Sequence, residues 1–131
     1  INLNGRKITA LPARHVVPAV GYQIDSGTAS LVFSGDTTTN DAFWQAVNKI
    51  VHLRYLIIET AFPNAERGLA EVSRHLCPSM LAEELLKLKS KPEVYITHLK
   101  PGDVDLTMRE IGECVQGFKP IMLLNGQIFE F

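Results

Sequence analysis

Short apolar segments typical of strands alternate with stretches of helical spacing along the chain, and this alternation constrains the fold more than any other feature. The strand-like segments are 6–11, 20–24, 29–33, 55–58 and 94–96. The last two are continuous apolar runs, which are typical of strands buried on both faces and need cover from helices or a second sheet. We therefore predict an α/β fold in a single unit over 1–131, with a mixed sheet and flanking helices.

Helical spacing marks three segments between these strands. The first starts at a cap formed by Asn40-Asp41 and carries an apolar stripe that reaches Val51; the second opens at Pro78-Ser79, includes Leu88 and stops before Pro92; the third begins at Asp103 or Asp105 and ends near Gly117. The stretch around Pro63-Asn64 is interpreted as a polar loop. Near the end of the chain, Asn125-Gly126 stands between two β-prone runs, which predicts a hairpin.

Charge and cysteine content exclude several functional classes. The 131 residues have a formal charge of −1, which gives no overall attraction to nucleic acid or to an anionic membrane, so nucleic acid is not an expected partner. No apolar run approaches the ~18–20 residues that cross a bilayer. The two cysteines, Cys77 and Cys114, form neither a disulfide framework nor a close-spaced zinc pair, so the expected location is the reducing cytoplasm.

Five polar residues stand at or near the ends of the predicted elements. They are His15, Asp36, Glu59, His75 and His98. Any one of them alone is typical of a cap, a turn or a satisfied hydrogen-bonding group, and we interpret His52 near a helix end in that way. As a set, histidine and aspartate are the ligands that zinc, manganese and iron prefer. These residue types identify a candidate metal site, and their wide separation along the chain means that only the fold could bring them together.

The segments around these residues resemble the metallo-β-lactamase superfamily and occur in the order seen there. They are Ala13–Tyr22, Leu31–Thr37, Ile57–Phe62, Ser73–Leu76 and Ile96–Pro101. Within the superfamily the chain most resembles the class II 3′,5′-cyclic-nucleotide phosphodiesterases, with the transfer-RNA 3′-processing endonucleases (ribonuclease Z) as nearest relatives. The motifs Ser-Gly-Asp-Thr, Glu-Thr-Ala-Phe, His-Leu-Cys-Pro and Thr-His-Leu-Lys-Pro are specific as a set, and the match covers nearly the whole chain.

The resemblance implies an αββα sandwich and a hydrolase that converts cyclic AMP or cyclic GMP to the 5′-monophosphate. It implies two divalent metal ions, with zinc the first expectation and manganese or iron as alternatives, which hold a hydroxide for attack on phosphorus. His15 resembles a ligand of one metal, Asp36 the bridging carboxylate and His98 a ligand of the second. Glu59 and His75 resemble the pair that hands a proton to the leaving oxygen in ribonuclease Z-like enzymes.

Four cations near these motifs are candidates to bind the substrate phosphate, and Arg74 and Lys100 are the two that we select. For Arg14 and Arg67, the interpretation as solvated surface cations is at least as well supported as phosphate binding.

The superfamily signature His-x-His-x-Asp-His, which supplies most ligands of both metals, is absent from 1–131. The chain, which begins at Ile1, is therefore expected to be the C-terminal half of the sandwich. With about two protein ligands for each cation instead of three or four, it is expected to bind metal weakly and to be inactive alone. Its apolar sheet face is expected to meet the missing N-terminal half, a partner chain or a swapped copy in a homodimer.

Two alternatives remain open. A transfer-RNA 3′-endonuclease needs a basic arm or another large RNA-binding surface, and none is visible in the sequence. A non-catalytic module would keep the fold without the chemistry.

Overall fold

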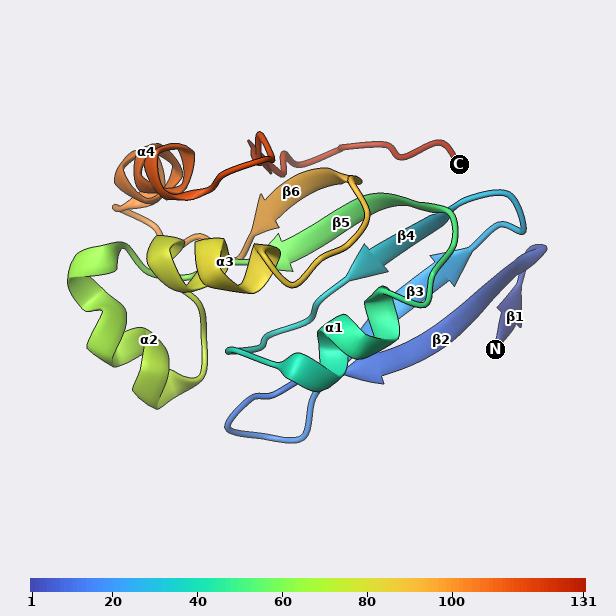
Figure 1. The fold of residues 1–131 in the computed structure, drawn as a ribbon, viewed down its shortest axis with the longest axis horizontal. Coiled ribbons are helices and arrows are strands. Elements are labelled where there is room, and N and C mark those ends of the chain that lie inside the picture. The colour runs from blue at the N-terminus through green and yellow to red at the C-terminus, as the bar shows by residue number, and fades with distance from the viewer.

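A computed structural model describes all residues 1–131 and shows a seven-stranded mixed sheet (Figure 1). The strands are β1 (Asn2–Leu3), β2 (Arg6–Pro12), β3 (Val20–Asp25), β4 (Ser30–Phe33), β5 (Leu53–Glu59), β6 (Glu93–Thr97) and β7 (Ile121–Met122). Their order across the sheet is their order in the sequence. β1 to β4 pair antiparallel, whereas β4 to β7 pair parallel.

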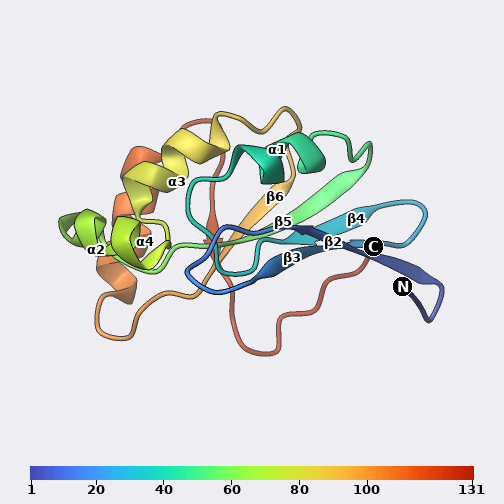
Figure 2. The ribbon, with the colours of Figure 1, turned by 90° about the horizontal axis from the view of Figure 1, so that it is seen from below.

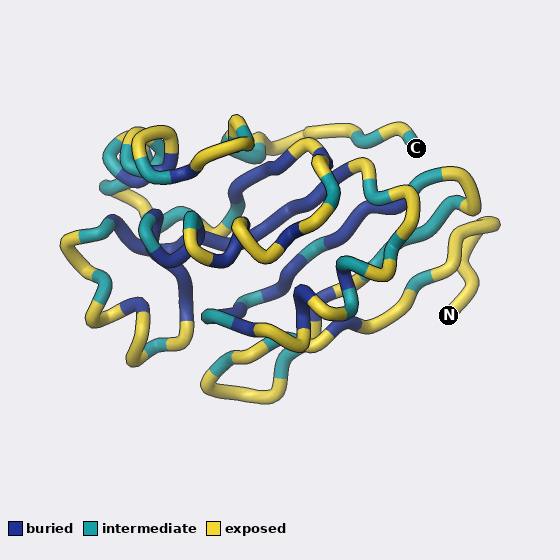
Figure 3. The backbone as a smooth tube through the Cα atoms, viewed as in Figure 1, coloured by how far each residue is buried: buried dark blue, intermediate teal, exposed yellow.

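The helices cover one face of this sheet, as Figure 2 shows. They are α1 (Asp41–Val47), the short 3₁₀ helix η1 (Asn64–Glu66), α2 (Arg67–Ser73), α3 (Pro78–Leu85) and α4 (Val104–Cys114). Twenty buried apolar residues fill the space between the helices and the sheet. Burial is concentrated in β4, β5 and β6, while much of β2 is exposed (Figure 3). None of the helices is both long and apolar enough to cross a bilayer.

The opposite face of the sheet carries a second, smaller apolar cluster. Leu31, Tyr55, Ile57 and Tyr95 form its buried part. The C-terminal tail lies over this face (Figure 2), and the ring of Phe129 lies 5.0 Å from that of Tyr55 between centroids. Farther along the face, Tyr22 pairs with Phe33 in the sheet register and is 41% exposed. The tail therefore covers only the β4–β6 part of this face.

The predicted α/β fold and all five predicted strand segments are confirmed. The side chain of Asn40 caps α1 by accepting a hydrogen bond from the Phe43 N–H at 3.2 Å, and Pro78 occupies the first turn of α3. Both features are those that the sequence predicts for helix starts.

Several expectations are wrong in detail. α1 ends at Val47, so Val51 is 83% exposed instead of widening the apolar stripe. α3 ends at Leu85, and Leu88 is buried from the following turn. The segment after Pro63 forms η1 and α2 instead of a loop.

The predicted C-terminal hairpin is also wrong. The turn at Asn125-Gly126 forms, with Gln127 N–H donating to the Leu124 carbonyl at 3.1 Å. β7, however, pairs parallel with β6, and residues 127–131 join no strand. Because Phe129 and Phe131 bury apolar area by crossing the sheet face, the tail packs its aromatic rings there instead of returning beside β7.

Candidate active site

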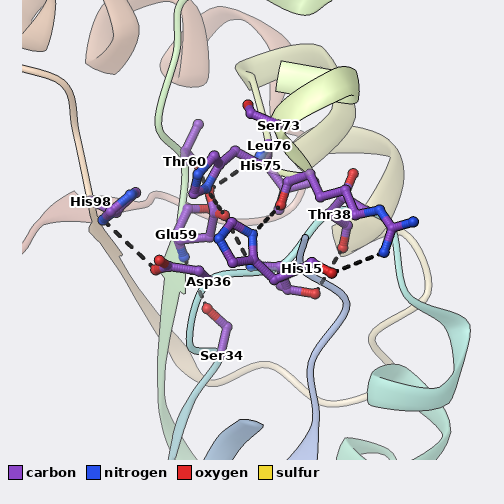
Figure 4. A network of polar contacts seen from close by, with 12 residues as sticks. His15, Ser34, Asp36, Thr38, Glu59, Thr60, Ser73, His75, Leu76 and His98 are labelled. Carbon is purple, nitrogen blue, oxygen red and sulfur yellow. Dashed lines mark hydrogen bonds and ion pairs between the residues drawn. The ribbon is translucent and has the colours of Figure 1, made fainter. Parts of the chain in front are cut away.

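The five predicted site residues converge at one edge of the sheet (Figure 4). Asp36 follows β4, Glu59 ends β5 and His98 follows β6. These strands are parallel, so their carboxyl ends meet at one edge, where sites of α/β sheets usually lie. His15 follows β2, which runs in the same direction as β4, and His75 follows α2.

Two glycines shape the loop that carries Asp36. Gly35 has φ +62°, and a Cβ atom there would lie 2.5 Å from the Val20 carbonyl oxygen. A Cβ atom on Gly21 would lie 2.6 Å from the Phe33 carbonyl oxygen. The close approach of β3 to this loop therefore requires glycine at both positions. This explains the glycine of Ser-Gly-Asp-Thr in physical terms.

Glu59 is a fully buried carboxylate with all its partners in place. Its Oε1 lies 2.7 Å from His75 Nδ1 and accepts from the Thr37 N–H at 3.0 Å. Its Oε2 accepts from the Leu76 N–H at 3.2 Å. These contacts fix the carboxylate between the Asp36 loop and the His75 segment, and they orient the imidazole with Nε2 away from Glu59.

The hydrogen bond that His75 donates to Glu59 raises the pKa of His75 above its usual value, although burial opposes this shift. Coulombic attraction to Glu59 and to Asp36 adds to the increase in pKa. The raised pKa favours a protonated His75 near neutral pH, although the nearby charge of Lys100 opposes the increase.

This pKa shift predicts a pH-dependent stability for the metal-free chain. Protonated His75 stabilises the fold fully below its unfolded pKa of about 6.5, and the contribution is lost as pH rises through the higher folded pKa. Chemical denaturation of the metal-free chain from pH 6 to 9 is expected to show this decline, and His75→Gln is expected to flatten it. Identical pH profiles for the two proteins would contradict the prediction.

His98 reaches the site from a left-handed backbone conformation, with φ +64°. Its ring stacks on His75 with centroids 4.9 Å apart, and its Nδ1 lies 3.7 Å from Asp36 Oδ1. Left-handed backbone is uncommon for residues other than glycine and persists where surrounding contacts enforce it. The following loop is held by the Lys100 N–H, which donates to the Ala61 carbonyl at 3.1 Å.

His15 lies on the other side of His75, with ring centroids 4.8 Å apart. Its Nδ1–H donates to the Arg74 carbonyl at 3.2 Å, since a carbonyl can only accept. This hydrogen bond fixes the tautomer and leaves Nε2 free to act as a ligand. The Arg74 guanidinium returns a hydrogen bond to the His15 carbonyl at 2.9 Å.

The proposed ligands His15, Asp36 and His98 have the donor chemistry of a divalent-metal site and are partly open to solvent. No group of three or more His, Cys, Asp or Glu side chains in this chain has a geometry that could hold a metal ion. The donor types thus fit a metal, while these 131 residues do not assemble a set of three ligands.

The four candidate cations differ in their surroundings. Lys100 Nζ lies 5.4 Å from the Phe62 ring centroid, and Arg74 contacts His15. Arg67 forms ion pairs with Glu71 and Glu83 at 3.0 and 3.5 Å, so its charge is already partnered. Arg14 has no carboxylate partner and reaches only the Thr39 carbonyl, at 3.5 Å.

Sequence reasoning missed the residues that hold Glu59. The Ser34 hydroxyl accepts from the Glu59 N–H at 3.1 Å, and the Thr37 backbone donates to the Glu59 carboxylate. Both residues lie in the Ser-Gly-Asp-Thr motif, and this motif is the sequence signal from which they could have been found. Phe62, whose ring centroid lies 5.9 Å from that of His75, also belongs to the site.

Comparison with known proteins finds no matching family model and no matching curated sequence. Solved structures do match. The metallo-β-lactamase fold protein YhfI from Bacillus subtilis has a TM-score of 0.80 at 20% identity, over 99% of this chain and 52% of that one. Yeast PDE1 has a TM-score of 0.76 at 19% identity, over 96% and 46%. Human tRNase Z, short form, has a TM-score of 0.71 at 14% identity, over 99% and 45%. The chain spans about half the length of these proteins.

Proposed function

We propose that this chain, which has the metallo-β-lactamase fold, carries part of the active site of a metal-dependent phosphodiesterase that hydrolyses 3′,5′-cyclic nucleotides to 5′-monophosphates. The motif resemblance to the class II cyclic-nucleotide phosphodiesterases supports the substrate class. The structural similarity to yeast PDE1 is consistent with it. A small cyclic nucleotide is thus the proposed substrate, and the cytoplasm is the proposed location.

The observation that carries the proposal is the buried Glu59–His75 pair behind three partly exposed ligand-type side chains. In the proposed reaction, protonated His75 donates from Nε2 to the oxygen that leaves phosphorus. Glu59 holds the imidazole in place and stabilises its charge, because its own carboxylate is fixed by two backbone N–H groups. Arg74 and Lys100 are proposed to hold the phosphate oxygens.

His15, Asp36 and His98 are the residues proposed to bind metal, with Asp36 shared between two ions. When bound, two divalent cations supply an activated nucleophile and neutralise charge that develops on the phosphate. Zinc is the proposed metal, with manganese or iron as alternatives. This chain alone is proposed to bind metal weakly, because it contributes about two ligands for each ion.

The remaining ligands are proposed to come from a His-x-His-x-Asp-His segment outside 1–131, in an N-terminal half of the complete protein. The second sheet face offers a place for that half to pack, since the tail leaves the part of it around Tyr22 exposed. The chain's coverage of about half of each matched structure is consistent with this arrangement.

Hydrolysis of 3′,5′-cyclic AMP by the intact protein tests the proposal, with release of 5′-AMP measured with and without added zinc or manganese. Metal-dependent release of 5′-AMP is the expected result. A protein that binds two metals and yet leaves cyclic AMP and cyclic GMP unchanged would overturn the proposal that cyclic nucleotides are the substrate. A protein with neither metal nor turnover would instead be a non-catalytic module.

A transfer-RNA 3′-endonuclease is the second candidate, because the Glu59–His75 pair resembles that of ribonuclease Z and because tRNase Z shares the fold. Cleavage of a transfer-RNA precursor, in the absence of cyclic-nucleotide hydrolysis, would favour it.

His75→Ala in the intact protein is expected to preserve metal content and to slow turnover in a manner that depends on the leaving group. With cyclic AMP, whose ribose oxygen is a poor leaving group, the loss is expected to be about 10²–10⁴-fold, the usual contribution of a general acid. With a p-nitrophenyl phosphodiester, the loss is expected to be small, since an acidic phenol leaves without a proton. Equal losses on both substrates would contradict the role of proton donor.

A further inference from the structure

We propose that the cleft between residues 13–20 and Arg74 binds the nucleoside monophosphate portion of the substrate. Arg14 would add to the phosphate contacts proposed for Arg74 and Lys100, and the apolar loop Val16–Pro18 would pack against the flat base. The inference rests on the proposed function for the choice of a nucleotide as ligand. It goes further by naming the subsite and the residues that determine specificity.

The cleft lies directly beside His15, which forms part of its wall. It is a shallow hollow that is largely open to solvent, with a volume of about 550 Å³. Its lining consists of Ala13, Arg14, His15, Val16, Val17, Pro18, Ala19, Val20 and Arg74. The lining thus combines two permanent cations with an apolar wall and contains no carboxylate. A ligand with a phosphate at one end and an apolar ring at the other matches this division.

The two arginines are available to a ligand. Arg74 bonds only to the His15 carbonyl, and Arg14 makes a single long contact with the Thr39 carbonyl. Neither forms an ion pair, in contrast to nearby Arg67, which has two carboxylate partners. Both arginines also line a second hollow of about 340 Å³, whose other lining residues are Thr38, Thr39, Met80 and the ion pair Arg67–Glu71. Unpaired guanidinium groups that converge on one space are typical of phosphate recognition.

The backbone of Arg74 gives independent support. It caps α2 in the left-handed conformation, at φ +57°. Helices usually place glycine or asparagine at such a position, because a Cβ atom is disfavoured there. The left-handed conformation is thus held at Arg74 without glycine, as occurs at functional positions in other proteins.

The loop on the other wall is held before any ligand arrives. The Arg14 N–H donates to the Thr37 hydroxyl at 2.9 Å, and the Arg14 carbonyl accepts from the Thr38 N–H at 3.0 Å. Val16 and Val17 are 56% and 59% exposed, so they do not serve the core. The start of the loop is thus anchored at Arg14, and Val16 and Val17 present apolar side chains next to two cations.

Binding of 5′-AMP to the purified chain in metal-free buffer with a chelator tests the inference, with inorganic phosphate and adenosine as partial ligands. Arg74→Gly is the decisive variant, because glycine suits the backbone while the guanidinium is lost. We expect its melting temperature to be unchanged or higher and its affinity for 5′-AMP to fall at least tenfold. Val17→Ser is expected to weaken the binding of 5′-AMP several-fold and to leave the binding of inorganic phosphate unchanged. Lys89→Ala, a change of equal charge at an exposed remote lysine, is expected to alter neither affinity.

Unchanged 5′-AMP affinity in Arg74→Gly would overturn the inference, as would 5′-AMP binding no tighter than inorganic phosphate. If Arg74→Gly does not fold, Arg14→Ala applies the same test from the other wall. A trinucleotide with a 5′-phosphate distinguishes a free nucleotide from the end of an RNA. If the cleft binds a free nucleotide, the trinucleotide is expected to bind no tighter than 5′-AMP; tighter binding of the trinucleotide would contradict the inference and favour an RNA end. Because no turnover is measured, failure of this subsite and failure of the phosphodiesterase proposal give separate results.

Discussion

Replacing Asp36 by alanine is expected to abolish phosphodiester hydrolysis by the intact protein and to lower its metal content. The carboxylate is proposed to serve both cations, so its loss removes a ligand from each. Changes to residues that only orient metal ligands reduce activity about 10–100-fold, and the loss for Asp36→Ala is expected to be larger. Metal content by elemental analysis and turnover of cyclic AMP are the two measurements.

Glu113→Ala provides the control, because Glu113 is an exposed carboxylate on α4. Its activity and metal content are expected to equal those of the unmodified protein. Full activity of Asp36→Ala with two metals bound would contradict the assignment of the bridging ligand.

Replacing Glu59 by alanine is expected to lower the free energy of unfolding by about 3–5 kcal/mol, the usual effect of removing one partner from a buried charged pair. The substitution leaves the buried N–H groups of Thr37 and Leu76 and the His75 ring without their acceptor. It therefore disconnects the Asp36 loop from the His75 segment. Urea denaturation of the metal-free chain at pH 7 measures the change.

Two further variants refine this measurement. Glu59→Gln retains the shape but turns an amide group toward one of its donors, so an intermediate loss is expected. Glu66→Ala removes an exposed carboxylate and is expected to change stability by less than about 0.5 kcal/mol. Similar small losses in all three variants would show that Glu59 does not link these segments.

The strands could be predicted because their signals are local. The apolar run at Tyr55–Ile58 and the cap at Asn40 depend on neighbouring residues, and both are confirmed. The hairpin predicted for the C-terminal tail is wrong because the path of the tail depends on contacts with residues far away in the sequence. Asn125-Gly126 does form a turn, but packing of Phe129 against Tyr55 determines the path that follows. The helix α2 was missed because it is short and buries only Ala70.

The residues of the candidate site could be selected from the sequence, whereas their geometry could not be predicted. Motif resemblance selected His15, Asp36, Glu59, His75 and His98, and parallel strands explain why several of them meet. The roles of backbone groups could not be predicted, because the N–H groups of Thr37 and Leu76 carry no side-chain signal. The mutual hydrogen bonds of His15 and Arg74 likewise join residues that no local pattern links.

The identity of strand order and sequence order has a consequence for synthesis on the ribosome. Each strand pairs with the one made immediately before it. Such a sheet can grow from one side as the chain emerges: the antiparallel strands β1 to β4 join through short connections, whereas the parallel pairs close over the longer segments 34–52, 60–92 and 98–120. The polar cluster is completed late, since His98 follows the sixth strand and only α4, β7 and the tail come after it. A nascent chain whose emerged part ends between β5 and residue 75 is therefore expected to resist proteolysis over β2–β5 while Glu59 still lacks His75.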